Sequence, residues 1–449
     1  MKIELLIKPR WLITVNSQNK VLEHYCLVVH DGKIKDILPA DAAEQVYQPR
    51  QTVDLPEHAL LPGLINAHTH AAMALMKGLA DDLPLMEWLR DYIWPAEARY
   101  ANEAYVYNST QIAIGEMIRS GTTCFNDMYF FPEATLRAVQ KSGIRASLGM
   151  IMMDLPTAYA ADPTAYLERG AALHTASLAD PLVSTTCAPH APYTVSDKPL
   201  AALQQRAQAW GVPLHMHIHE TAREVTEAVA QQHERPLARL NRLGLLHSSM
   251  QAVHMTQLLE EEIELIAQQG VHVIHCPESN MKLASGFCPV AKLLEAGVNV
   301  ALGTDGNASN NDLDMIGEMH SAALLGKVVA HNATVLPAHE VLRMATINGA
   351  KALGLESSIG SLEGGKAADM IAIDLGGLDS LPLYDPVSHL VYCTTRQQVT
   401  HVWVAGKALM EQRKLQTLDE TELTSIARHW QKRLENFANE LKCANNTQC

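Results

Sequence analysis

The sequence has few of the features that mark secreted, membrane-bound or nucleic-acid-binding proteins. It has no run of about 18 apolar residues, so we expect no membrane-spanning segment. Acidic residues outnumber basic ones, 49 to 35, and a formal net charge of -14 argues against nucleic acid or an anionic membrane as a partner. Met1–Lys8 carries charges at Lys2, Glu4 and Lys8, which leaves no apolar region for a signal peptide.

Closely spaced cysteines are also missing. The eight cysteines are scattered along the chain, with no C-x-x-C pair and no regular spacing. We therefore expect neither disulfides nor a cysteine zinc site, and interpret the thiols as reduced in a cytoplasmic protein. A hydrophobic content of 47% and a charged content of 19% are typical of an ordinary folded chain.

The middle of the chain alternates apolar, strand-like runs with helical stretches of mixed polarity. This βα alternation predicts a closed parallel (β/α)8 barrel, an α/β fold of the TIM type, over residues 59–355. Helical patterns separate the strands, for example at 102–120, 199–210, 221–232, 258–269 and 290–296. The eight predicted strands are 60–66, 121–126, 144–151, 182–188, 213–218, 251–255, 271–275 and 298–303.

The two ends of the chain are rich in β-forming residues. Short strands are expected at 11–15, 26–29 and 33–38, with Asp31-Gly32 as a hairpin turn, and again at 361–373 and 399–405. Each set is too small for a strong core, so we predict that residues 1–58 and 356–418 form one composite β-sandwich. Residues 419–449 are expected to form an amphipathic helix over 421–441 and a frayed tail from Cys443.

The first polar cluster of the predicted barrel is His68-Thr69-His70, after the apolar run that begins at Ala59. Residues i and i+2 of a strand point to the same side, so the two imidazoles can share one metal ion. A bare His-x-His is weak evidence in a chain with 21 histidines. It gains weight because other polar residues follow other strands, where a barrel enzyme keeps its site.

The fifth and eighth strands add further candidate ligands. Leu214–Glu220 contains His215, His217 and His219 on one nominal face, so periodicity alone does not choose among them. Asp305 follows the eighth strand and can complete a set of three histidines and one carboxylate for zinc. Glu220 lies close to this set without being needed as a ligand, and is the natural proton carrier.

His190 follows the fourth strand and His254 ends the sixth, and each alone could be a buried structural histidine.

Two other zinc-site types are excluded. His219-Glu220-Thr221-Ala222-Arg223 is not H-E-x-x-H, and no P-C-x-x-C accompanies an H-x-E, so the zincin and cytidine-deaminase patterns are absent.

With these residues assembled, the chain resembles the amidohydrolase superfamily over nearly its full length. The matching motifs occur in order: PGLINAHTH at 62–70, HMHIHET at 215–221, AVHM at 252–255, HCPESNMKLASG at 275–286, LGTDGNASNND at 302–312 and GSLEGGKAADMIAID at 360–374. Within this superfamily, Leu83–Leu89, Pro95–Glu97 and Asp127–Tyr129 are most similar to 5-methylthioadenosine/S-adenosylhomocysteine deaminases.

The resemblance implies one Zn²⁺ per subunit and assigns roles to particular residues. The family ligand lies three residues before the glutamate, which selects His217 and leaves His215 and His219 as structural residues. The substrate would be a small adenine nucleoside, and a homo-oligomer is compatible with the resemblance. The implied metal ligands are His68, His70, His217 and Asp305, the substrate contacts Glu97, His190, Glu220 and Asp305, and the catalytic residues Glu220, His254 and Asp305.

Two positions depart from relatives. Residues 182–190 contain no lysine that could bridge a second metal, so a single ion is expected. Where some relatives carry an arginine, this chain has Met150, which puts part of the recognition of the 5′ substituent in question.

The alternatives are another amidohydrolase activity, on adenosine, 5′-deoxyadenosine, guanine or a triazine, and a non-catalytic barrel scaffold. Glu97 separates the nucleoside substrates from guanine and a triazine, because it has a purpose only for a substrate with a ribose diol.

Overall fold

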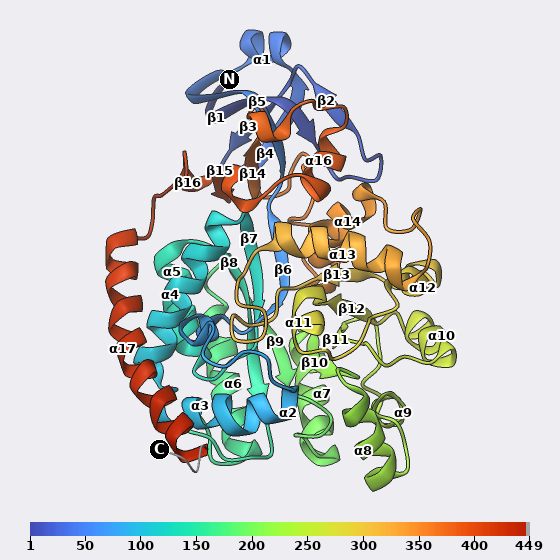
Figure 1. Ribbon diagram of the computed structural model, residues 1–449. Helices are drawn as coiled ribbons and strands as arrows, with labels where there is room; N and C mark the ends of the chain where they lie inside the picture. Colours follow the sequence, from blue (N-terminus) through green and yellow to red (C-terminus); the bar gives the residue numbers. More distant parts are fainter. Residues whose placement is uncertain (446–449) are drawn as a thin grey trace.

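The computed structural model describes residues 1–445, which form an eight-stranded parallel barrel and a separate nine-stranded mixed sheet (Figure 1). The barrel strands follow one another in chain order, and each overlaps one of the eight strands predicted from the sequence. The predicted fold class is therefore confirmed. The strands are β6 (Leu64–Thr69), β7 (Thr122–Asp127), β8 (Arg145–Met152), β9 (Val183–Pro189), β10 (Leu214–Ile218), β11 (Met250–His254), β12 (His272–His275) and β13 (Val300–Leu302).

Helices surround the barrel, which explains why its strands are buried along nearly their whole length. All six residues of β6 and all eight of β8 are buried, for example. The surrounding helices are α4 (Glu103–Arg119), α5 (Pro132–Ser142), α6 (Pro163–Ser177), α7 (Asp197–Trp210), α8 (Ala222–Gln232), α9 (Pro236–Arg242), α10 (Glu260–Gln269), α11 (Pro277–Lys282), α12 (Val290–Glu295), α13 (Met315–Val329), α14 (Ala338–Met344) and α15 (Ile347–Ala352).

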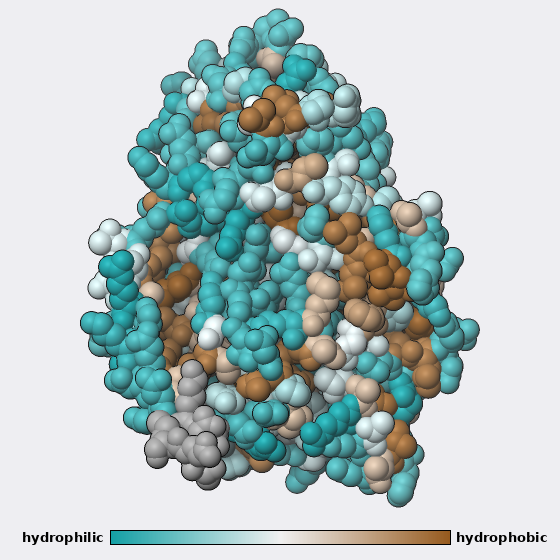
Figure 2. Space-filling model, viewed as in Figure 1, coloured by the Kyte–Doolittle hydropathy of each residue, from teal (hydrophilic) through white to brown (hydrophobic). Residues whose placement is uncertain are grey.

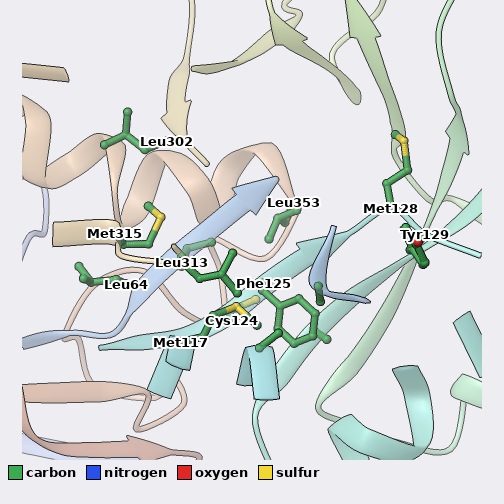
Figure 3. Packing of buried hydrophobic residues seen from close by; sticks show 14 of the residues in the cluster. Leu64, Met117, Cys124, Phe125, Met128, Tyr129, Leu302, Leu313, Met315 and Leu353 are labelled. Carbon is green, nitrogen blue, oxygen red and sulfur yellow. The ribbon is translucent and has the colours of Figure 1, made fainter. Parts of the chain in front are cut away.

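The core between barrel and helices is continuous. Phe125 and Cys124 of β7 lie beside Met117 of α4 (Figure 3). Leu64 of β6 and Leu302 of β13 lie nearer to α13, the helix that begins with Met315. Each of these side chains is fully buried. The strands that carry the polar site are thus held by tightly packed apolar neighbours.

The mixed sheet contains strands from both chain ends, as expected. Its order is β17-β16-β15-β14-β5-β1-β3-β4, with β2 paired to β1. Asp31 and Gly32 both have positive φ, as a tight turn between β3 and β4 requires. The strands are β1 (Lys2–Ile13), β2 (Val21–Glu23), β3 (Tyr25–His30), β4 (Lys33–Pro39), β5 (Gln48–Pro62), β14 (Met370–Asp374), β15 (Val399–Val404), β16 (Lys407–Glu411) and β17 (Lys414–Leu415). Helix α1 (Ala40–Val46) packs against β3 and β4, whereas α16 (Pro386–Tyr392) packs against α13 and α14.

Two predicted strands differ from the structure. The stretch 60–66 is divided at Gly63: β5 ends at Pro62 in the mixed sheet, and β6 begins at Leu64 in the barrel. The stretch 361–373 is a strand only from Met370, because residues 361–369 form turns that lead to the sheet. The boundaries of the three predicted domains remain predictions.

The C-terminal helix α17 (Glu420–Asn445) lies along the barrel next to α4. Its buried side chains, among them Leu423, Trp430 and Phe437, face the barrel, and its outer surface is hydrophilic (Figure 2). The expected amphipathic helix is therefore present and runs to Asn445, while the rest of the predicted tail, 446–449, lies outside the described residues. None of the described helices is long and apolar enough to cross a membrane.

A side-chain seam closes the barrel between β6 and β13. These strands share no hydrogen-bonded ladder within the described residues. Instead the Asn66 amide donates to Thr304 Oγ1 at 2.7 Å, and the backbone N–H of Thr304 donates to Asn66 Oδ1 at 3.0 Å. The N–H of Asp305 donates to the carbonyl of His68 at 3.0 Å. The seam therefore sets two predicted metal ligands side by side.

A buried ion pair joins the barrel to the mixed sheet. Arg145, at the start of β8, donates to both carboxylate oxygens of Asp369, at 2.7 and 3.2 Å. Asp369 precedes β14 and also accepts the backbone N–H of Ala405 at 2.7 Å. Both charged side chains are buried, so each depends on the other to offset its desolvation.

Replacing Asp369 with alanine should destabilise the fold by about 3–5 kcal/mol, because the guanidinium of Arg145 would remain buried without a counter-charge. The measurement is the free energy of the first unfolding transition in urea. As a control, Glu227→Ala removes only an exposed partner of Arg223 and should change that free energy by less than about 1 kcal/mol. Equal losses in the two variants would show that the buried pair does not hold the sheets together.

Candidate active site

A cavity of about 560 Å³ opens at the C-terminal ends of the barrel strands. Polar side chains from the strand ends form its inner part. The outer part is apolar and comes from α2 (Leu85–Trp88), the π-helical turn η2 (Leu89–Ile93), α3 (Trp94–Tyr100) and the loop at 153–159. The apolar lining residues include Leu85, Trp88, Leu89, Ile93, Trp94, Phe130, Phe131, Met153, Leu155 and Tyr159.

The four predicted metal ligands meet at the bottom of this cavity. His68 Nε2 and His70 Nε2 each lie 3.2 Å from Asp305 Oδ1, and His217 Nε2 lies 3.3 Å from His70 Nε2. Two overlapping groups of three side chains each bring one ligand atom per residue within 4.8 Å of the others. One group is His68, His70 and His217, and the other is His68, His254 and Asp305. Three imidazoles and a carboxylate at this spacing fit a divalent metal ion such as zinc.

The remaining nitrogen of each histidine is hydrogen-bonded away from the cluster. His70 Nδ1 lies 2.5 Å from the carbonyl oxygen of Met128, and His217 Nδ1 lies 2.7 Å from that of His190. His68 Nδ1 lies 2.9 Å from Nε2 of His215. These contacts aim all three Nε2 atoms into the cluster, as metal ligation by histidine requires.

Asp305 has the largest number of polar contacts in the cluster. Ser279 and Ser309 donate to its Oδ2 at 2.7 and 2.9 Å, and the N–H of Gly306 donates to Oδ1 at 2.8 Å. Burial opposes the charged form, but hydrogen bonds from His68 and His70 hold the pKa of Asp305 well below its usual range. The backbone of Asp305 has φ +62°, a left-handed conformation that turns the chain at the strand end.

Glu220 and His254 flank this cluster. His254 Nε2 lies 3.9 Å from Glu220 Oε2, and His254 Nδ1 lies 2.9 Å from Asn280 Oδ1. Burial raises the pKa of Glu220, which favours the protonated carboxyl group. The N–H of Glu220 donates to Glu224 Oε2 at 2.8 Å, which fixes the backbone that carries this carboxyl group.

Glu97 and His190 also line the cavity. Burial raises the pKa of Glu97 to about 7, although His70 nearby acts in the opposite direction. His190 Nδ1 lies 3.0 Å from Thr194 Oγ1, which leaves its Nε2 available to the cavity. All eight predicted site residues thus lie in or directly beneath one cavity, and their roles remain predictions.

One sequence expectation is changed by the local backbone. His219 does not share the face of His215 and His217, because β10 ends at Ile218 and His219 has φ +53°; its Nδ1 lies 3.9 Å from Glu262. Met150 does not line the cavity, and its side chain packs against Gly170 of α6 instead.

Sequence reasoning named His215 only as a structural residue, and it missed the other residues that orient the site, namely Ser279, Asn280, Ser309 and Glu224. Asn280 and Ser279 lie within the run HCPESN, whose likeness to relatives was visible while its contacts were not. Serine, asparagine and glutamate are common residues, and no spacing rule connects Ser279 to Asp305, 26 positions away.

The comparison with known families agrees with this geometry. The model of the amidohydrolase family matches residues 59–409, which is most of the chain. The chain belongs to the amidohydrolase family. Among its relatives, the 5-methylthioadenosine/S-adenosylhomocysteine deaminase of Saccharophagus degradans is 48% identical over 96% of this chain and 97% of its own length. The corresponding deaminase of Teredinibacter turnerae is 46% identical, over 96% and 98%.

Solved structures of this family agree with the fold. A zinc-bound adenosine deaminase from Xanthomonas campestris has a TM-score of 0.96 at 48% identity, over 97% of this chain and 99% of its own. Atrazine chlorohydrolase from Arthrobacter aurescens, complexed with zinc, has a TM-score of 0.86 at 24% identity, over 95% and 99%. At that lower identity the likeness speaks for the fold alone.

Gly303 allows the end of β13 to approach β6 beside the predicted metal ligands, and Gly303→Ala tests this contact. A Cβ there would lie 2.8–2.9 Å from backbone and Cβ atoms of His68. We expect a loss of about 1–3 kcal/mol in unfolding free energy, and a lower zinc content after dialysis, because the overpacked strand displaces Asp305. Gly377→Ala, which would meet no atom within 4 Å, is the control and should match the wild type. Wild-type stability and zinc content in Gly303→Ala would contradict this account.

Proposed function

We propose that this protein hydrolytically deaminates 5-methylthioadenosine and S-adenosylhomocysteine at C6 of the adenine ring. Water replaces the amino group, and the products are ammonia and an inosine-type nucleoside. The observation that carries this proposal is the position of Glu220 and His254 beside four metal-ligand side chains, in a cavity that also contains Glu97. The relatives that share 46–48% of the sequence over nearly its full length support the choice of substrate.

The cluster suits one Zn²⁺ per subunit, held by His68, His70, His217 and Asp305. When bound, such an ion lowers the pKa of a coordinated water towards about 7, so that hydroxide is available near neutral pH. The residues 182–190 offer no lysine for a second ion.

The surrounding residues then have distinct tasks. Glu220, in its protonated form, gives its proton to the ring nitrogen next to C6 as the water oxygen adds to C6. His254 and Asp305 orient that oxygen, and His254 stabilises the negative charge that develops on it. The Glu220 carboxylate then takes the proton of the new hydroxyl group at C6 and gives it to the amino group, which leaves as ammonia, and the next water molecule restores the proton of Glu220. His190 and Glu97 would hold the base and the ribose.

The outer cavity favours an uncharged 5′ substituent. No lysine or arginine among the described residues lines it, and its walls are mainly apolar and aromatic. The methylthio group of methylthioadenosine fits these walls, whereas the amino-acid end of S-adenosylhomocysteine would lie without a cation for its carboxylate. Met150 has no part in this preference, since its side chain packs on α6.

Ammonia release from methylthioadenosine, S-adenosylhomocysteine, adenosine, adenine and guanine is the test of this function. The zinc-loaded protein should turn over the thioether nucleosides above the free bases, with methylthioadenosine first by about tenfold or more in kcat/KM. Metal removed by a chelator should abolish turnover, and added zinc should restore it. If the protein turned over only a free base, or if it held zinc and turned over none of these compounds, the proposed substrates would be ruled out.

Glu220→Gln tests the proton route. Glutamine keeps the size of the side chain but carries no acidic proton, so kcat should fall by about 10²- to 10⁴-fold while zinc stays bound. Zinc content by elemental analysis and kcat on methylthioadenosine are the measurements. Glu227→Gln, on the exposed part of α8, is the matched control. Near-normal turnover by zinc-loaded Glu220→Gln would exclude Glu220 as the proton donor.

We expect Glu97 to make kcat/KM for the substrate depend on pH. Its pKa is raised to about 7, so below that pH the carboxyl group is protonated and accepts hydrogen bonds from a ribose diol less well. The kcat/KM for methylthioadenosine should therefore rise between about pH 6 and 8, and Glu97→Gln should lose this rise and about tenfold in kcat/KM at pH 8. A 2′,3′-dideoxy substrate should be indifferent to the substitution. An unchanged pH profile in Glu97→Gln would contradict the assignment.

A further inference from the structure

We propose that His215 is a positioning residue for the metal cluster, which fixes the tautomer and the ring orientation of His68. This inference rests on the metal site of the proposed function. His215 lies on β10 two residues before His217, is fully buried, and does not line the cavity. It therefore touches neither substrate nor reacting atoms, and acts only through His68.

The geometry defines the direction of the hydrogen bond between the two rings. His68 Nε2 faces Asp305 in the cluster, and His68 Nδ1 lies 2.9 Å from His215 Nε2. A neutral histidine that gives Nε2 to a metal must carry its proton on Nδ1. His68 Nδ1–H then donates to His215 Nε2, so the proton of a neutral His215 must lie on Nδ1.

His68 differs from the other two histidine ligands in the nature of its partner. His70 and His217 donate to the backbone carbonyls of Met128 and His190, which accept in every state of the protein. The partner of His68 is a side chain that can be either donor or acceptor. If His215 carried its proton on Nε2, it would donate to His68 Nδ1 and force the proton of His68 onto the nitrogen that faces the metal.

Polar groups beneath His215 hold it in place. His215 Nδ1 lies 3.2 Å from the side-chain amide of Asn126, whose nitrogen also donates to the Ala67 carbonyl and to Gln251 Oε1, at 3.1 and 2.7 Å. Gln251 in turn donates to the carbonyl of Ala352 at 2.7 Å. Ala67 and Gln251 accept both protons of this nitrogen, so Asn126 donates none to His215 Nδ1 and leaves that nitrogen free to carry the proton of a neutral His215. Buried polar groups thus extend from Ala352 to His68.

The test compares zinc affinity among variants at this position. His215→Leu and His215→Ala remove the acceptor for His68 Nδ1–H, and the zinc dissociation constant, measured by competition with a colorimetric chelator, should rise about 10- to 100-fold. His215→Gln offers a side-chain oxygen near the position of Nε2 and should restore most of the affinity. His219→Asn, on the same segment but outside the cluster, is the matched control and should bind zinc as the wild type does.

Melting temperatures of the metal-free variants separate positioning from folding. Similar melting temperatures for His215→Leu and His215→Gln, with weak zinc binding only in His215→Leu, are the expected result. Wild-type affinity in His215→Leu, or equally weak binding by His215→Gln, would overturn the proposal.

The wild-type protein gives a second measurement that needs no folded variant. Long-range ¹H–¹⁵N NMR of the zinc-loaded protein should find both His68 and His215 protonated on Nδ1. A proton on His215 Nε2 would overturn the proposal. Neither measurement uses turnover, so a protein that holds zinc but deaminates no nucleoside would end the proposed function and leave this inference standing.

Discussion

Closure of the barrel between β6 and β13 is the constraint on which the candidate site depends. The two strands lie at opposite ends of the strand order, and they meet through side-chain hydrogen bonds of Asn66, Thr304 and Thr69 and through the backbone hydrogen bond from Asp305 to His68. Because those same residues border the predicted metal ligands, the candidate site is assembled only when the barrel is closed. Metal binding and barrel closure should therefore stabilise each other, as linkage requires for any ligand that binds the folded state alone.

The inner and outer parts of the cavity are built in different ways. The inner part belongs to strand ends, where His254 and Asp305 adopt positive φ and aim their side chains through backbone turns that the packed barrel holds in place. The outer part consists of short helical turns over residues 85–100 and a loop at 153–159. Chemistry can thus stay constant on the rigid strands while the short segments adapt to the substrate, a division common to barrels of this kind.

Much of this arrangement could be predicted from the sequence, and the failures have physical causes. Apolar runs with helical stretches between them identified all eight barrel strands, because a parallel barrel must bury both faces of every strand. Alternation failed at His219, because this residue follows the last residue of β10 and has a left-handed backbone conformation. The division at Gly63 was invisible because Leu60, Leu61 and Leu64 are equally apolar, although they belong to different sheets. The polar partners of the ligands, such as His215 for His68 and Ser279 for Asp305, come together only through tertiary structure.

The mixed sheet has a consequence for the synthesis of the chain. Pro62 of β5 pairs with Met370 of β14, so strands made at the start must wait for partners made near the end. At about 5–20 residues per second the delay is some tens of seconds, during which the whole barrel emerges from the ribosome. Throughout that time the edge of β5 that β14 will cover has no partner, and the nascent chain presents an open strand edge of the kind that attracts other chains. The mixed sheet can therefore form fully only when strands from the last quarter of the chain pair with strands from the first quarter.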